Sequence, residues 1–452
     1  MKKQLLCSAI TLALAAPAQA AVLIGSYGAS TTLGQVASPT TINSVRYNPA
    51  AGYIALDINN NESMRFGYWS QIGGSVEFGK ADNFEDDIDR LISDLDDFND
   101  KLDATINATM GTNPSSIFAS ETEAFNTAKG IETDFNSLLE TFGDDGRIKA
   151  SFSSSIPGLP VVFQVPKLPG VISLDAGVGF VSSATFKDAP FSGLPADASG
   201  ITDYNQLNDF KTDSQVVVKG GTLFQVGLGY SQPISSIREI GPLQGELILG
   251  AKANLYIASL ASVKTKVDRD DDKDVGDLIS DGLEESEDST AIGIDVGAVW
   301  AAENYQLGLT LKNLNSPELE SSLSDDLNTT SGTQTISLDP QTTVDGAAFL
   351  KDRMFMLAGS MDLNKVDDLV GDEVQMMHVS GSFFPASTLI PTIRLGYEKN
   401  LVGEELSAIN AGIGLFRGVM NLDATYGLET TEVDGDSIPR RLGIQLSFEE
   451  TF

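Results

Sequence analysis

His378 is the only histidine of the chain, and Cys7 is the only cysteine. A catalytic serine or cysteine needs a histidine base and a third group that orients the base. Ser380 lies two residues after His378, which places both side chains on the same face of an extended segment. We interpret these two residues as part of a wall. A metal centre with several histidines is excluded by count, so we expect no catalytic residue, no metal ligand and no cofactor, and we predict that the chain is not an enzyme.

The stretch from Asp268 to Asp277 is the most acidic part of the sequence. A calcium loop of the helical-hand type needs glycine at its sixth position and glutamate at its twelfth. Counted from Asp270, these positions hold Val275 and Asp281. We interpret the stretch as a solvated surface loop, with loose binding of divalent cations as the alternative. The whole chain has 63 acidic and 29 basic residues, a formal net charge of −34, which would repel phosphates, and we expect no nucleic-acid partner.

From residue 147 onward, apolar and polar side chains alternate. In residues 305–312 every second side chain is Tyr or Leu, and those between are Gln, Gly, Thr and Lys. Successive side chains of a strand point to opposite faces, so this pattern predicts a sheet with one apolar and one polar face. The charged residues on the polar faces are candidates for lining a watery lumen: Glu246, Lys252, Asp295, Lys312, Arg394 and Asp423. We expect them to pair between strands and to solvate the lumen, with a substrate path as the alternative.

The connections between these strands favour a closed transmembrane barrel. Long polar connections such as 188–213 and 315–338 alternate with tight turns such as 351–352. Long loops on one side and short turns on the other are typical of outer-membrane barrels, whereas a β-sandwich, the soluble alternative, has no reason to separate its loops by length. The predicted fold class is all-β: a transmembrane antiparallel β-barrel of about 14 strands over residues 63–452, with an N-terminal plug and a helical extracellular insert.

Three segments depart from the strand pattern. Residues 1–20 have two lysines, an apolar stretch and a small-x-small end, which predicts a secretory signal peptide. Residues 21–62 are rich in Gly, Ser, Thr and Ala and are expected to form either a mobile tail or a plug in the lumen. In residues 80–146 the apolar side chains recur at helical spacing among many acids, which predicts an acidic helical hairpin inserted after the first strand.

The turn Asn48-Pro49-Ala50 lies shortly before the first predicted strand, and Asn-Pro is a turn signal. With the predicted barrel after it, the sequence resembles the FadL-like clan of outer-membrane transporters. In that clan a short N-terminal hatch with an Asn-Pro-Ala turn plugs a barrel that passes long-chain fatty acids and other hydrophobic molecules. The acidic helical insert is similar to one branch, the TraF-like plasmid conjugal-transfer proteins. The resemblance implies that Asn48, Pro49 and Ala50 act as a hatch or gate.

Three functions are consistent with these observations. The first is a plugged channel for passive uptake of small hydrophobic compounds, with a hydrophobic small molecule as its ligand. The alternative is a TraF-like structural or docking protein of conjugal transfer, with a protein partner at the 80–146 hairpin. A general porin that favours cations is the third. For each of them we expect export to the outer membrane of a Gram-negative bacterium, surrounded by lipid and lipopolysaccharide.

Overall fold

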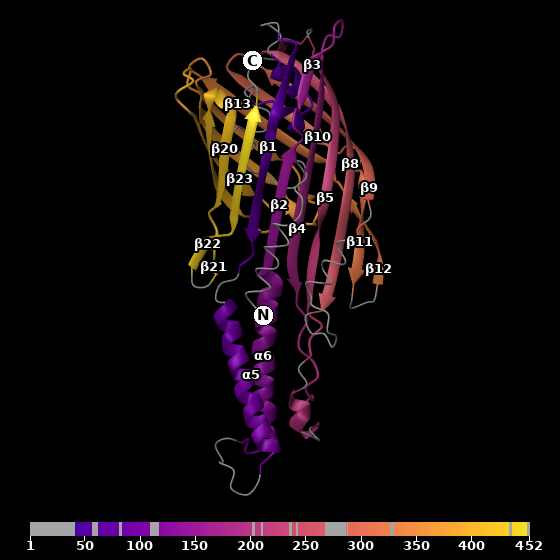
Figure 1. Cartoon of the computed structure of the whole chain (residues 1–452), viewed down its shortest axis with the longest axis vertical. Helices are drawn as coiled ribbons and strands as arrows, with labels where there is room; N and C mark the ends of the chain where they lie inside the picture. The colour runs from indigo at the N-terminus through magenta and orange to yellow at the C-terminus, as the bar shows by residue number, and fades with distance from the viewer. Residues whose placement is uncertain are drawn as a thin grey trace.

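The computed structural model describes most of the chain (Figure 1). The described residues are 41–56, 62–80, 84–108, 117–200, 204–208, 211–234, 237–240, 243–266, 286, 288–325, 330–433 and 436–449. The predicted signal peptide and the acidic stretch 268–277 lie outside these residues. Among the helices in the described ranges, none is both long and apolar enough to span a membrane.

The described strands occupy fourteen antiparallel positions that close on themselves, because the first strand pairs with the last. In order around the wall, they are β1 (Met64–Phe78), β2 (Arg147–Ser155), β4 (Val171–Lys187), β5 (Gln215–Pro233), β8 (Glu246–Lys266), β9 (Asp288–Ala301), β10 (Tyr305–Lys312), β13 (Gln341–Leu350), β14 (Phe355–Asp362), β17 (Met376–Phe383), β18 (Thr392–Asn400), β19 (Ser407–Leu415), β20 (Met420–Gly427) and β23 (Arg441–Glu449). This confirms the predicted fold class.

The two faces of the wall differ as the alternation predicts. Outward side chains are apolar and exposed, for example Ile292 at 60%, Leu395 at 58% and Ile444 at 59%. Inward side chains are polar and buried, for example Asp295 at 4% and Arg394 at 1%. An apolar outer band with a polar interior is the arrangement of a barrel that faces lipid.

Two features of the wall were not predicted. The second strand position is divided between β2 and the short β3 (Val161–Gln164), which both pair with β1 and β4. A hairpin of β11 (Glu318–Asp325) and β12 (Thr330–Ser337) lies beside the C-terminal end of β8, and β11 runs parallel to β8. The three longest strands, β4, β5 and β8, make this side of the barrel taller than the rest (Figure 1).

The two ends of the barrel carry different connections. The start of β1 and the end of β23 lie together at one end, since Gly67 pairs with Glu449. Short turns, including the 3₁₀ helix η6 (Phe416–Gly418), lie at that end together with the hairpin β6 (Glu239–Ile240)–β7 (Leu243–Gln244). The other end carries the longer loops and the hairpin β21 (Thr430–Val433)–β22 (Asp436–Pro439). In outer-membrane barrels short turns face the periplasm, and we name the two ends periplasmic and extracellular accordingly.

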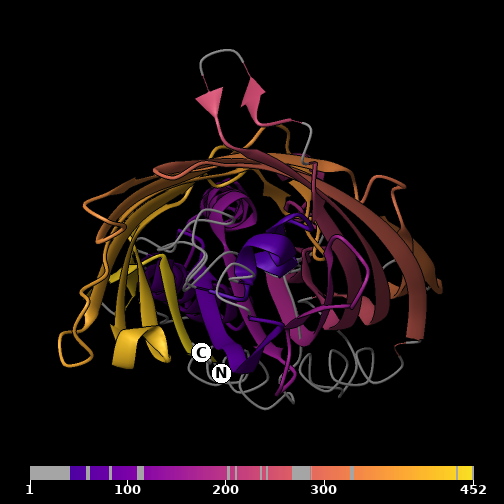
Figure 2. The same ribbon diagram turned by 90° about the horizontal axis from the view of Figure 1, so that it is seen from above.

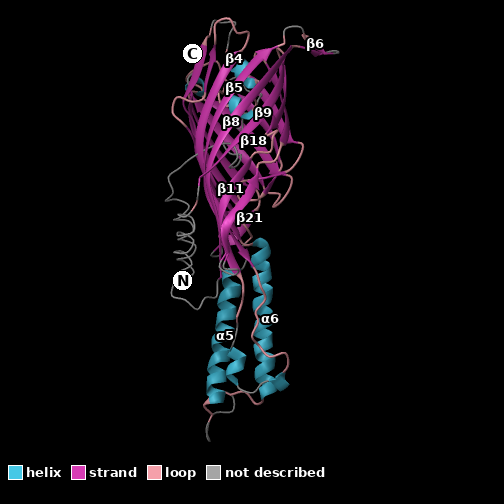
Figure 3. Ribbon diagram, turned by 90° about the vertical axis from the view of Figure 1, so that its right-hand side faces the viewer, coloured by secondary structure: helices cyan, strands magenta, loops and turns pink. Residues whose placement is uncertain are grey.

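Two long helices, α5 (Phe84–Ile106) and α6 (Glu121–Asp145), project from the extracellular end (Figures 1 and 3). The helix α6 begins at the N-cap Ser120, whose side chain accepts the N–H of Glu123. Each helix is about 35 Å long at 1.5 Å per residue. Their apolar stripes face each other and the 3₁₀ helices η4 (Ala198–Gly200) and η5 (Tyr204–Asn208). The shared core includes Phe98, Leu102, Phe118, Phe125, Ile131 and Leu207. We call α5 and α6 the extracellular module.

The N-terminal part of the described chain lies inside the barrel (Figure 2). Residues 41–56, which we call the plug, form two short helices, α3 (Ser44–Tyr47) and α4 (Ala51–Ala55), joined by the turn Asn48-Pro49-Ala50. The apolar side chains of the plug pack on the periplasmic parts of β3, β4, β8 and β9 through Val162, Val171, Ile248 and Val299. The sequence left open a mobile tail or a plug in the lumen, and residues 41–56 form the plug.

Candidate functional site

The turn of the plug is held against the inner wall by Asn48, which is completely buried. Its side-chain oxygen accepts the N–H of Ala50 at 2.8 Å, so the turn is closed by the asparagine itself. Its side-chain nitrogen donates to the carbonyl oxygen of Leu309 at 3.1 Å and to that of Ala298 at 3.4 Å. The turn is therefore tied to two neighbouring strands, β9 and β10.

Two glycines of the wall make room for this turn. A Cβ at Gly297 would lie 1.9 Å from the side-chain oxygen of Asn48, and a Cβ at Gly250 would lie 2.4 Å from the backbone of Pro49 and Ala50. Both distances are far shorter than any Cβ contact in a folded protein. The glycines of β8 and β9 thus let the plug turn lie in direct contact with the backbone of the wall.

The first residues of the plug are attached to the end of the last strand. The buried carboxylate of Glu449 accepts the backbone N–H of Ile42 at 3.0 Å and the hydroxyl of Thr41 at 2.5 Å. The guanidinium of Arg65 lies 3.8 Å from the same carboxylate and also donates to the carbonyl oxygen of Ala55 at 3.2 Å. Sequence reasoning did not select Glu449, although it shares the polar parity of Gln445 on β23.

The middle of the plug contacts charged side chains of the wall. Arg46 is buried and donates to the carbonyl oxygen of Ala176. Lys252 donates to the carbonyl oxygen of Arg46 at 3.4 Å and pairs with Asp175 at 3.3 Å. The ammonium of Lys312 lies 5.7 Å from the ring centroid of Tyr47, within the range of a cation–π contact.

The six charged residues that the sequence placed in the lumen fall into separate groups. Lys252 and Lys312 contact the plug as described. Asp295 is buried and accepts the side chain of Asn254 at 2.7 Å and the N–H of Asn313 at 2.9 Å. Glu246 begins β8 at the periplasmic end, where it is half-buried.

Arg394 and Asp423 form a separate, completely buried ion pair. The guanidinium of Arg394 donates to both carboxylate oxygens of Asp423, at 2.8 and 2.9 Å, and to Asn421 at 2.8 Å. The pair passes over β19, where a Cβ at Gly412 would lie 2.1 Å from Asp423 and 2.8 Å from Arg394. Glycine at this position is what allows two strands that are not neighbours to exchange an ion pair.

His378 lies between Ser360 and Glu398 on adjacent strands of the inner wall. Its Nδ1 is 3.3 Å from the hydroxyl of Ser360, and its Nε2 is 3.4 Å from the carboxylate of Glu398, which pairs with Arg441 at 2.8 Å. Acyl transfer at a serine also needs backbone donors for the oxyanion. Ser360 lies inside β14, whose backbone pairs with β13 on one side and β17 on the other. The geometry therefore favours a role for His378 in pairing along the wall.

The surface of the extracellular module is strongly acidic. Together α5 and α6 contain sixteen acidic and three basic residues. The start of α6 shows how the acids stabilise the helices: Glu123 accepts the N–H of Ala119 at 2.8 Å and the ammonium of Lys101 at 3.0 Å. These two contacts lower the pKa of Glu123 below the ordinary range of glutamate. The contact with Lys101 also ties α6 to α5.

Comparison with known proteins gives a family and several similar folds. Residues 45–362 match the family model described as F plasmid transfer operon, TraF, protein. Among solved structures, the Pseudomonas putida toluene transporter TodX is 11% identical, covers 96% of this chain and 100% of its own, and has a TM-score of 0.41. The TodX deltaS2S3 mutant monoaromatic hydrocarbon channel is 11% identical with a TM-score of 0.44, covering 95% of this chain and 100% of its own. The Salmonella typhi outer-membrane phospholipase is 10% identical with a TM-score of 0.25, covering 86% and 93%. No curated protein matches the sequence.

Proposed function

We propose that this chain, which belongs to the family of TraF proteins of the F plasmid transfer operon, serves in plasmid transfer as a structural and docking protein of the outer membrane. The family match, which spans most of the plug, the extracellular module and most of the wall, supports a role in transfer. The apolar outer face of the barrel supports insertion in the outer membrane of a Gram-negative bacterium, in contact with lipid and lipopolysaccharide. The extracellular module is the surface that meets the partner.

The observation that carries this proposal is the independent core of the extracellular module. Phe98, Phe118 and Phe125 are buried among α5, α6 and η5, so the two helices are held rigidly beyond the end of the barrel. The helix faces left exposed carry acids such as Asp96, Asp97 and Asp100. A rigid acidic rod attracts basic surfaces and speeds their association, more strongly at low salt. The partner is therefore a protein with a basic surface segment.

The register at the base of the module gives a clean way to remove it. Phe78 of β1 pairs with Ile148 of β2, and the N–H of Gly79 donates to the carbonyl oxygen of Arg147 at 2.6 Å. The two strands can thus be joined by a short turn in place of residues 81–145. Barrels with this replacement should insert normally and should support plasmid transfer at a frequency lower by several orders of magnitude.

A matched control shortens the β21–β22 hairpin, another extracellular projection of the same wall. This control should transfer plasmid at the normal frequency. Normal transfer by the barrel that lacks the module would overturn the docking proposal. Pull-down of surface proteins with and without the module, at low and high salt, tests whether the partner is basic. Capture that does not weaken at high salt would contradict the electrostatic attraction between the module and its partner.

A plugged channel for small hydrophobic compounds is the second candidate, supported by the plug and its seat at Gly250 and Gly297. The gate would be the turn Asn48-Pro49-Ala50. The polar lining of the wall, with Arg394, Glu398 and Asp423 fully buried on the inner face, disfavours a hydrophobic solute and ranks this candidate second. Flux of a monoaromatic solute into vesicles should not change when residues 21–52 are removed. A flux that appears only after this removal would put the channel first.

A further inference from the structure

The loop between β14 and β17, residues 363–375, crosses the lumen at the extracellular end. We call it the strap; it contains the short pairing of β15 (Val366–Asp367) with β16 (Glu373–Val374). The loop leaves the wall at the ninth strand position, and its tip contacts β2, which is the second position of fourteen. These positions lie on opposite sides of the barrel, so the strap spans the lumen from wall to wall.

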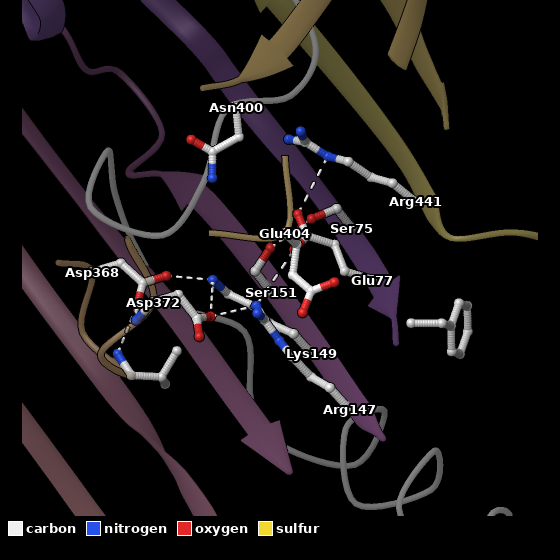
Figure 4. A network of polar contacts seen from close by, with 12 residues as sticks. Ser75, Glu77, Arg147, Lys149, Ser151, Asp368, Asp372, Asn400, Glu404 and Arg441 are labelled. Atoms are coloured by element: carbon white, nitrogen blue, oxygen red, sulfur yellow. Dashed lines mark hydrogen bonds and ion pairs between the residues drawn. The ribbon is translucent and has the colours of Figure 1, made fainter. Parts of the chain in front are cut away.

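An ionic contact holds the tip of the strap (Figure 4). Asp368 accepts the ammonium of Lys149, and Asp372 accepts the same ammonium at 2.7 Å and the guanidinium of Arg147. On β5, Lys219 donates to the carbonyl oxygen of Val370 at 3.1 Å. We call this set of contacts the clasp.

The tip has a fixed shape that presents these groups together. The carboxylate of Asp368 accepts the N–H groups of Val370 and Asp372, each at 3.0 Å, and its carbonyl oxygen accepts the N–H of Gly371. Gly371 has φ of +87°, which glycine adopts at no steric cost. One carboxylate therefore both folds the tip and binds the opposite wall.

Apolar packing attaches the tip to the wall at the same level of the lumen. Leu369 and Val370 at the tip are each 3% exposed. They pack in one cluster with side chains of the tall wall, among them Val181, Leu223 and Leu260. The plug packs in the periplasmic half of the lumen, and the strap crosses the extracellular half.

We infer that the strap is an extracellular gate, held shut by the carboxylate–cation clasp and independent of the plug. The barrel then has two barriers in series, the plug and the strap. The side chains of Lys149 and Asp368 are only 11% and 10% exposed, so this contact is weakened by salt less than a surface ion pair is. Removing the two strap carboxylates opens the extracellular barrier and leaves the plug in its seat.

A cysteine placed on the inner face of the wall reports on the gate. Ser380 is 5% exposed on the inner face of β17, two residues closer to the periplasm than His378. In a Cys7→Ser background, Ser380→Cys is the single thiol of the full chain. Its reaction rate with a polar maleimide is measured in detergent, with folding checked by heat-modifiable gel mobility.

Asp368→Asn together with Asp372→Asn should raise the labelling rate by about tenfold or more, since tenfold corresponds to about 1.4 kcal/mol and each lost charge-assisted hydrogen bond is of that order. The matched control is Lys365→Gln, which removes the pair of Lys365 with Glu373 inside the strap without touching the opposite wall. Labelling of this control should equal that of the parent.

Equal rates in the parent and the double variant would overturn the gate, and so would an equal rise in the control. A second measurement guards against misfolding of the double variant. Lys149→Gln, which removes the shared cation from the opposite wall, should speed labelling, while adding this change to the double variant should add little. A labelling rate of Lys149→Gln equal to that of the parent would also overturn the clasp as the element that holds the strap.

Discussion

The seat of the plug yields a prediction with a magnitude that the structure sets. In Gly297→Ala the new Cβ would lie only 1.9 Å from the side-chain oxygen of Asn48. To relieve the clash Asn48 must move, which breaks its hydrogen bonds to Leu309 and Ala298, worth about 0.5–1.5 kcal/mol each. Overpacking of a tight contact adds about 1–3 kcal/mol. Plug docking should therefore be weakened by at least about 2 kcal/mol, which raises the undocked population about thirtyfold.

The rate of trypsin cleavage measures the undocked population. Trypsin cleaves after arginine, and Arg46 is only 3% exposed in the docked plug, so cleavage there requires the plug to undock. When opening is fast relative to cleavage, the rate follows the equilibrium population of the open form. Mass spectrometry of the fragment that begins at Tyr47 should show cleavage about thirtyfold faster in Gly297→Ala. The matched control is Gly381→Ala, whose Cβ would meet only Leu357 at an ordinary 3.6 Å.

The reasoning also requires non-additivity. In an Asn48→Ala background the clash is gone, so Gly297→Ala should add little to the undocking that the first change causes. Cleavage after Arg46 at the same rate in Gly297→Ala and Gly381→Ala would refute the assignment of this glycine as the seat of the turn. Full additivity of the two changes would refute the contact between Asn48 and Gly297 as its cause.

Three further changes test other parts of the molecule. Arg394→Ala removes the guanidinium that pairs with the buried carboxylate of Asp423 and should lower the free energy of unfolding by about 3–5 kcal/mol in urea titrations. Changing both residues to alanine should cost less than the two single losses combined. Phe98→Ala should destabilise the extracellular module by about 3–5 kcal/mol, seen as faster amide exchange in the module with the barrel unchanged. The pKa of Glu123 is lowered by its contacts with the N–H of Ala119 and with Lys101, so these contacts stabilise the module above the ordinary glutamate pKa of about 4.3, and their contribution is lost as pH falls through the lowered value. Amide exchange at the start of α6 should accelerate there, and Glu123→Gln should abolish that dependence.

The barrel could be predicted from sequence because a strand that separates lipid from a polar lumen must alternate at every residue. The alternation in residues 305–312 predicted one strand of a sheet, and β10 has these bounds. The same parity placed Asp295, Arg394 and Asp423 on the inner face, where they are buried. The helical spacing in residues 80–146 likewise led to α5 and α6, since a change of period marks a change of element.

The contacts that cross the barrel could not be predicted in this way. Alternation predicts which face of the sheet a side chain is on, but it does not predict its partner. Lys252 was expected to pair between strands, and the fold shows that it pairs with Asp175 and also contacts the plug. The strap carries acids and turn residues, a composition typical of any exposed loop. Its path across the lumen depends on Lys149 and Arg147, which are distant in sequence. The parallel pairing of β11 with β8 depends on the unequal lengths of β8 and β9, which no local pattern records.

We propose a barrel that is closed at two levels, by the plug and by the strap, with the extracellular module as its partner surface. The most direct test is single-channel current in a planar bilayer, recorded for the full chain and for a chain that lacks residues 21–56, with folding checked by gel mobility. We predict no sustained current in either form, because the strap still spans the lumen when the plug is absent. Sustained current through the full chain, or current that appears once the plug is removed, would contradict a closed docking platform.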